Sequence, residues 1–266
     1  MNIFLSLSGK KQKLQGRKSR LSTPICQDLC ASHLLPYANP CPLSYISFTP
    51  EAYFWAMIQH LILDLGGVLL KTNYEAVGNN FRALGMDGLK KVFFDPGPNN
   101  ILYRFEKGQI DGPAFAREML SMAPKGVSEH QIRHAWDSIL DGIWPDTLPL
   151  LQQLRKRYRL YLWSNINDWH YQTYRSMMQQ LHPELDFESL FQKAYYSHLI
   201  GHRKPDPEGY RLILDEQKLD ANTTVFVDDL PENAKGASAV GIKGLHLDLG
   251  KGDTLKELLL REGLLD

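Results

Sequence analysis

The chain has 266 residues, of which 43% are hydrophobic and 23% charged, and its formal net charge is zero. Such a balance is typical of a globular protein in water, and it gives no electrostatic reason to expect binding to nucleic acid or to a membrane surface. No apolar run approaches the ~20 residues that a membrane-spanning helix needs. We therefore expect a cytoplasmic protein with no membrane partner; composition leaves the oligomeric state open.

The first 56 residues differ from the rest of the chain. They hold all three cysteines and a cluster of basic residues between positions 10 and 20, and five prolines interrupt any periodic pattern. The cysteines have neither the paired spacing nor the histidine partners of a zinc site. Three interpretations of residues 1–56 stay open: a disordered tail, an organellar presequence, or upstream sequence from a mis-assigned start, with Met57 as the natural first residue.

A run of apolar residues, "HLILDLGGVLL", follows at positions 60–70. It contains Asp64 and then two glycines, which predicts a buried strand that ends in a carboxylate and turns sharply. A parallel strand buried on both faces has this pattern, and ligands bind beyond the carboxyl ends of such strands. Asp64 needs a nearby cation or hydrogen-bond donors, because an unpaired carboxylate in a core is costly.

Residues 71–142 have helical patterns throughout. The spacing of apolar residues predicts helices over 75–84, 100–107, 113–122 and 128–140, and the last begins with a capping-box pattern, Ser128 followed by Gln131. No strand pattern is visible here. We therefore predict an all-helical insertion over residues 71–142.

From residue 146 the pattern changes to alternating helices and strands. Strands are predicted over 158–165, 193–197, 223–229 and 243–248, and helices over 146–154, 168–181, 206–217, 231–240 and 253–265. Strands that alternate with helices through short connections predict a parallel sheet covered by helices on both faces. The expected fold is therefore an α/β core, residues 57–70 and 143–266, interrupted by the helical insertion.

Polar side chains follow three of the predicted strands: Asp64, then Ser164 and Asn165, then Asp228 and Asp229. If these strands are parallel neighbours, their polar ends meet at one edge of the sheet. Close carboxylates repel one another unless a cation lies among them, and their oxygen atoms suit Mg²⁺. Hydroxyl, amide and ammonium groups suit a phosphoryl group, and a carboxylate can act as a nucleophile.

Four segments, "LILDLGGV", "LWSN", "RKPDP" and "VFVDDLPEN", resemble the four ordered motifs of the haloacid dehalogenase (HAD) superfamily. "FEKGQI", "SNINDWH" and "RKPDPEGY" are similar to segments of the bacterial α-D-glucose-1-phosphate phosphatase group. The resemblance implies a Rossmann-like core with a helical cap between motifs I and II, and a Mg²⁺ cofactor. It also implies a phosphomonoesterase that acts on a small phosphorylated metabolite, with a sugar 1-phosphate as the candidate substrate.

The resemblance implies roles for individual residues. Asp64 would attack phosphorus and form an aspartyl-phosphate, while Ser164 and Lys204 would bind the phosphoryl group and Lys204 would also hold Asp64. The implied metal ligands are Asp64, the carbonyl of Gly66, Asp228 and Asp229. The candidate residues for contact with phosphate or substrate are Ser164, Asn165, Lys204, Glu106 and Arg203. A solvated helix end is the alternative for Glu106, while contact with acids of the cap or a simple surface salt bridge are the alternatives for Arg203.

Gly66 departs from the HAD pattern, because most HAD phosphatases have a second aspartate there that acts as general acid and base. Such catalysis is worth ~10²–10⁴-fold. The glucose-1-phosphatase-like group shares this glycine, and the anomeric oxygen of a sugar 1-phosphate needs less protonation than an ordinary alcohol. His170 in "SNINDWH" is one candidate substitute acid, and packing of a helix is the alternative.

Two other functions stay open at this point. The first is a dehalogenase-like hydrolase, because that branch of the superfamily also lacks the second aspartate; dependence on magnesium would separate the two. The second is a catalytically silent protein that has kept the HAD fold for binding.

Overall fold

The structure is a computed structural model, and it describes residues 58–87 and 100–266. The interpretations of residues 1–56, and the proposed first residue Met57, lie outside the described residues. A five-stranded parallel sheet with the order β5-β4-β1-β6-β7 organises the described chain. Its strands are β1 (His60–Leu63), β4 (Arg159–Ser164), β5 (Lys193–Tyr196), β6 (Thr224–Asp228) and β7 (Lys243–His246).

Strand β1 lies at the centre of the sheet, where it pairs with β4 on one side and β6 on the other. After β1 the chain forms β4 and β5 on one side of it and then crosses to form β6 and β7 on the other side. The strand order therefore changes direction beside β1. All four residues of β1 are buried, which agrees with the continuous apolar run in the sequence. In open α/β sheets, ligands bind beyond the strand ends at such a change of order. The topology therefore places the end of β1 at the expected ligand site.

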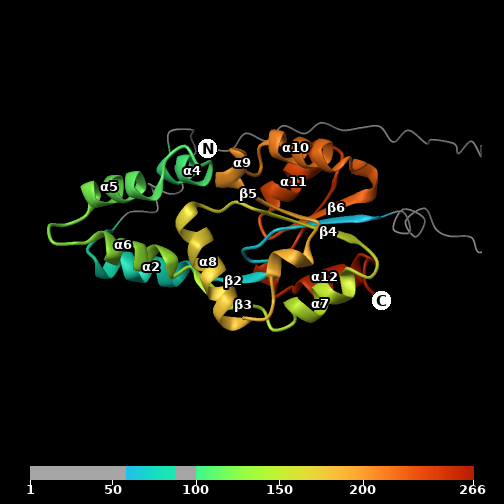
Figure 1. Ribbon diagram of the computed structural model, residues 1–266, viewed down its shortest axis with the longest axis horizontal. Helices are drawn as coiled ribbons and strands as arrows, with labels where there is room; N and C mark the ends of the chain where they lie inside the picture. Colours follow the sequence, from blue (N-terminus) through green and yellow to red (C-terminus); the bar gives the residue numbers. More distant parts are fainter. Residues whose placement is uncertain (1–57, 88–99) are drawn as a thin grey trace, which may run out of the picture. The chain divides into compact units, whose positions relative to one another are not determined.

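Helices cover both faces of the sheet (Figure 1). Leu61 and Leu63 point into a cluster with one set of helices, whereas Ile62 points into a cluster with the other. The first set is α7 (Thr147–Leu154), α8 (Asp168–Leu181) and α12 (Leu255–Arg261), and the second is α10 (Pro207–Gln217) and α11 (Pro231–Ala239). Successive side chains of a strand point to opposite faces, so β1 joins two hydrophobic cores. The predicted parallel α/β fold is confirmed.

A group of helices lies between β1 and β4 in the chain, which we call the insert helices. They are α2 (Tyr74–Ala83), α4 (Ile101–Glu106), α5 (Gly112–Met122) and α6 (Glu129–Asp137). Phe105 and Phe115 stack with ring centroids 4.3 Å apart in their own hydrophobic cluster. Trp169, which belongs to α8, is part of this cluster and approaches Phe115 to 5.4 Å between centroids. The insert helices thus share a packed aromatic centre with one helix of the sheet layer.

The prediction that residues 71–142 are helical throughout is wrong at both ends. Residues Leu70–Thr72 form β2 and Leu140–Ile143 form β3, and the two strands pair antiparallel. The predicted helix over 128–140 ends at Asp137. These strands have three and four residues and are only partly buried, so neither shows a clear period in the sequence. The β2–β3 pair therefore lies where the chain enters the insert helices after β1 and where it leaves them before α7.

Within the described ranges, the other short helical segments are η1 (Phe187–Leu190), α9 (Ser197–Ile200), η2 (Ala221–Thr223) and η3 (Leu249–Lys251). None of the helices in the described ranges has both the length and the apolar composition to cross a lipid bilayer.

Candidate active site

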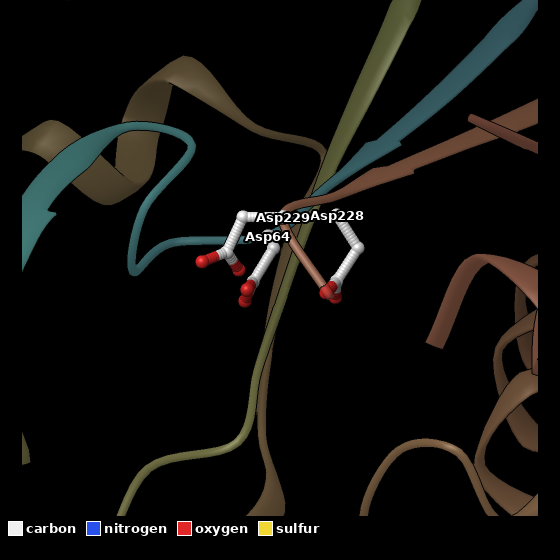
Figure 2. Close-up of side chains that lie close together, drawn as sticks. All are labelled: Asp64, Asp228 and Asp229. Carbon is white, nitrogen blue, oxygen red and sulfur yellow. The ribbon is translucent and has the colours of Figure 1, made fainter. Parts of the chain in front are cut away.

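Three carboxylates meet where β1 and β6 end (Figure 2). Asp64 follows β1, Asp228 is the last residue of β6, and Asp229 follows it. Each offers one oxygen, and these oxygens all lie within 4.8 Å of one another. Ser164, the last residue of β4, is buried at the end of the strand on the other side of β1. The structure therefore brings the predicted strand-end residues to one edge of the sheet.

Lys204 supplies the positive charge at this edge. Its Nζ lies 2.7 Å from Asp64 Oδ1 and 2.6 Å from Asp228 Oδ2, and it donates a hydrogen bond to the Trp163 carbonyl at 3.0 Å. Burial alone would lower the pKa of Lys204, but Asp228 and Asp64 outweigh burial and raise that pKa. Lys204 is therefore a charged ammonium held between two carboxylates.

Asp228 has both of its oxygens occupied. Oδ2 contacts Lys204, while Oδ1 accepts hydrogen bonds from the backbone of Leu230 and the side chain of Asn233, each at 2.9 Å. Tyr210 in turn donates to the Asn233 carbonyl at 2.6 Å. Asp228 is thus a fixed anchor for Lys204.

The negative charges of Asp64 and Asp229 are less well compensated than that of Asp228. Burial raises the pKa of Asp64 well above its usual range; Lys204 opposes this, while Asp228 and Asp229 add to it. Burial and the charge of Asp228 raise the pKa of Asp229 to about 6. When all are ionised, three carboxylates and one ammonium leave a net charge of −2. This excess of negative charge on hard oxygen ligands matches the requirements of a divalent cation such as Mg²⁺.

Two glycines form the turn after Asp64, and each has a close neighbour. Gly67 has φ +73°, and a β-carbon built there would lie 2.4 Å from Asp229 Oδ2. A β-carbon at Gly66 would lie 3.3 Å from Cγ2 of Thr72. Any side chain at position 67 would displace the Asp229 carboxylate, and an aspartate at position 66 would compete with Thr72 for space. No sequence pattern singles out Thr72, because a threonine on a three-residue strand belongs to no recognisable motif.

The structure gives Asn165 a specific contact. Its Oδ1 accepts from the Lys204 N–H at 2.8 Å, and its Nδ2 donates to the Lys204 carbonyl at 2.9 Å. This pair of hydrogen bonds ties the end of β4 to the segment that carries Lys204. The side-chain amide that was expected to contact phosphate is therefore engaged with the Lys204 backbone.

Glu106 and Arg203 pair with each other. Glu106 Oε2 lies 2.8 Å from Arg203 Nη2 and accepts from Arg203 Nε at 3.0 Å. Burial raises the pKa of Glu106, and Arg203 opposes that rise. The pair joins insert helix α4 to the segment just before Lys204, so Arg203 contacts an acid of the insertion, which was one of its alternatives, and Glu106 is not a solvated helix end.

His170 is packed inside the protein. Its Nδ1 lies 3.1 Å from the Asn167 amide nitrogen, its Nε2 lies 3.1 Å from the Trp136 carbonyl, and its ring stacks on Trp136 at 4.8 Å. Burial lowers the pKa of His170 to about 4. The contacts therefore match the packing interpretation rather than that of a substitute acid.

The fold and these residues define a class of α/β enzymes that concentrate charged groups where parallel strands end. The sequence profile of the family described as haloacid dehalogenase-like hydrolase matches residues 58–241. The chain belongs to this family of hydrolases.

Several relatives are phosphatases. The chain is 23% identical over 199 residues to a D-ribitol-5-phosphate phosphatase of Bacteroides thetaiotaomicron, covering 73% of this chain and 94% of the relative. It is 32% identical over 149 residues to a sesquiterpene phosphatase of Aspergillus oryzae, covering 54% and 70%. A solved HAD family enzyme of B. thetaiotaomicron, in complex with magnesium and inorganic phosphate, is 33% identical with a TM-score of 0.64, covering 73% of this chain and 96% of that one.

Proposed function

We propose that this protein is a Mg²⁺-dependent phosphomonoesterase that hydrolyses a small phosphorylated metabolite through an aspartyl-phosphate on Asp64. The observation that carries the proposal is the contact of Asp64 with buried Lys204 inside a carboxylate cluster of net negative charge. In this proposal residues 71–142, which contain the insert helices, act as a cap, and residues 57–70 and 143–266 form the core. The phosphatase names of two relatives, and the magnesium and phosphate bound to a third, support it.

The proposed reaction has two steps. An Asp64 carboxylate oxygen attacks phosphorus, and the bond between phosphorus and the alcohol oxygen breaks. That oxygen leaves with the bonding electrons and takes a proton from water, because Gly66 supplies no acid. Water then attacks the phosphorus of the aspartyl-phosphate, which releases inorganic phosphate and restores Asp64. Phosphoryl transfer depends mainly on positioning and charge neutralisation, so the Ser164 hydroxyl donates to the phosphoryl oxygens and Lys204 neutralises them.

The donor set fits Mg²⁺. Asp64 and Asp229 would hold the ion together with the Gly66 carbonyl, whereas Asp228 has both oxygens engaged and would act mainly by holding Lys204. When bound, Mg²⁺ supplies positive charge to the transferring phosphoryl group. Asp229→Asn is expected to weaken Mg²⁺ binding at least tenfold in a calorimetric titration, independently of any measured activity.

The absence of a general acid at position 66 favours substrates with good leaving groups, of which sugar 1-phosphates are one class. Initial rates on anomeric, aryl and primary alkyl phosphates, with Mg²⁺, test this preference. Equal kcat/KM values for all three classes would contradict it.

The main experiment compares the wild-type protein with Asp64→Asn on a panel of phosphate esters. We expect at least a 10³-fold loss of kcat, loss of beryllium fluoride binding, and loss of activity with a chelator. Asp253→Asn is the matched control, because it removes a carboxylate from a surface ion pair with Arg261. Halide release that a chelator does not affect would support a dehalogenase instead. No turnover and no beryllium fluoride binding would support a silent protein.

A further inference from the structure

The Glu106–Arg203 pair leaves one carboxylate oxygen available. Both contacts from Arg203 reach Oε2 of Glu106, whereas Oε1 makes no hydrogen bond within residues 58–87 and 100–266. The side chains are mostly buried, with exposed fractions of 13% for Glu106 and 22% for Arg203. Part of the Glu106 side chain remains accessible, so Oε1 can accept a hydrogen bond from a ligand. A ligand that covers Oε1 without offering a donor would leave a buried acceptor unpaired, which is costly.

Neighbouring contacts hold this pair in place. The Arg203 guanidinium lies 4.6 Å from the centre of the Tyr103 ring, and the Tyr103 hydroxyl donates to Asp206 Oδ2 at 2.6 Å. At the end of α4, a β-carbon at Gly108 would lie only 2.1 Å from the His198 carbonyl oxygen. The end of α4 therefore touches α9 backbone to backbone. Such fixed groups recognise a ligand without first being ordered, which favours specificity.

The pair also lies near the proposed reaction centre. Arg203 directly precedes Lys204, which contacts Asp64 at 2.7 Å. Burial raises the pKa of Tyr74, the first residue of α2, and the charges of Asp229, Asp64 and Glu106 raise it further. Tyr74 is nevertheless 57% exposed. Tyr74 therefore offers an accessible aromatic ring at the start of α2.

The ion pair with Arg203 explains how the Glu106 carboxylate can be tolerated close to a bound phosphate ester. An unpaired Glu106 would repel a phosphate dianion, but Arg203 cancels its charge while leaving Oε1 as an acceptor. An acceptor beside an aromatic ring suits a carbon skeleton that carries hydroxyl groups. A purely apolar skeleton would cover Oε1 without providing a donor, and burying an unsatisfied acceptor disfavours binding.

We propose that Oε1 of Glu106, held in place by Arg203, accepts a hydrogen bond from a hydroxyl group of the substrate's alcohol portion. The protein thereby selects phosphate esters of sugars and polyols over those of apolar alcohols. This inference rests on the proposed phosphatase function and assigns its substrate class.

The test compares two five-carbon primary phosphates, D-ribitol 5-phosphate and n-pentyl phosphate, which differ in their hydroxyl groups. We expect the wild-type protein to prefer ribitol 5-phosphate in kcat/KM, and Glu106→Ala to reduce that preference at least tenfold. Glu106→Gln keeps an oxygen acceptor and is expected to retain more of the preference. Glu118→Ala is the matched control, because Glu118 of α5 pairs with Arg104 of α4 at 2.6 Å and is not connected to Lys204; it should leave the preference unchanged.

The possible results separate the two proposals. If Glu106→Ala lowers kcat/KM equally for both substrates, so that their ratio is unchanged, the Glu106–Arg203 pair has a purely structural role. That result would overturn the inference while leaving the phosphatase function intact. A wild-type preference for n-pentyl phosphate would also overturn it. Failure of the wild-type protein to hydrolyse any phosphate ester or to bind beryllium fluoride would overturn the proposed function, and the inference with it. Glu106→Gln keeps the test informative if Glu106→Ala does not fold.

Discussion

Lys204 and Asp228 are in contact at 2.6 Å between Nζ and Oδ2, and their side chains have exposed fractions of 1% and 0%. An ion pair so deeply buried depends on each partner, because removing one leaves an uncompensated charge away from water. The same ammonium also contacts Asp64, so one side chain balances two carboxylates.

Lys204→Met is therefore expected to destabilise the metal-free protein by about 3–5 kcal/mol and to abolish activity. The free energy of unfolding in urea at pH 7 measures this loss. Lys193→Met is the control, because Lys193 forms a half-exposed pair with Glu216, and such pairs contribute about 0–1 kcal/mol. Similar losses in both variants would show that the buried cluster does not depend on its cation.

Gly67→Ala is expected to lower kcat/KM at least 100-fold, because the new methyl group would displace the Asp229 carboxylate. The variant also carries backbone strain of about 1–2 kcal/mol, since φ is +73°. Gly252→Ala separates the two effects: Gly252 has φ +80° but no heavy atom within 4 Å of an added β-carbon. The Gly252→Ala variant should lose stability without losing activity. An equal loss of activity in both variants would contradict the displacement of Asp229.

Stability of the metal-free protein should depend on Asp229 at mildly acidic pH. Its pKa rises from 3.8 to about 6 on folding, so the folded state keeps a proton that the unfolded state has lost. The free energy of unfolding therefore decreases as pH rises from about 4 to 6, by at most about 3 kcal/mol for a shift of this size. Asp229→Asn should reduce this pH dependence in chelator-treated protein. An unchanged slope would show that the carboxylate is ionised throughout.

His170 makes the stability depend on pH in the direction opposite to Asp229. Its pKa falls from 6.5 to about 4 on folding, so the unfolded state binds a proton that the folded state does not. Its contribution to stability is full above pH 6.5 and is lost as pH falls toward 4. His170→Gln should lessen this acid sensitivity while leaving the pH dependence of kcat unchanged. A shifted pH profile for kcat would restore His170 as a candidate acid.

The parallel sheet was predictable because its signals are local. Asp64 and Asp228 each end an apolar run, and the carboxyl ends of neighbouring parallel strands necessarily meet. Ser164 followed the same rule on β4. The alternation of strands and helices predicts a parallel sheet, and in such a sheet these residues meet if their strands are neighbours, as they are.

Contacts between distant segments were not predictable. Glu106 and Arg203 are 97 positions apart, and although a contact of Arg203 with acids of the cap was one alternative, no local pattern identifies Glu106 as its partner. Asn165 was expected to contact phosphate, but its amide bonds to the Lys204 backbone, a choice that depends on the loop geometry. The β2–β3 pair was missed because strands of three and four half-buried residues show no reliable period.

Trp169 has a consequence for the evolution of this protein. The residue belongs to α8, yet its side chain completes the aromatic cluster of the insert helices. A shortened chain without those helices would expose the indole to water and become prone to self-association. A foreign domain transplanted into the same position would have to provide a complementary apolar surface for Trp169. The insert helices can therefore be exchanged between relatives only for segments that supply an apolar surface against which Trp169 packs.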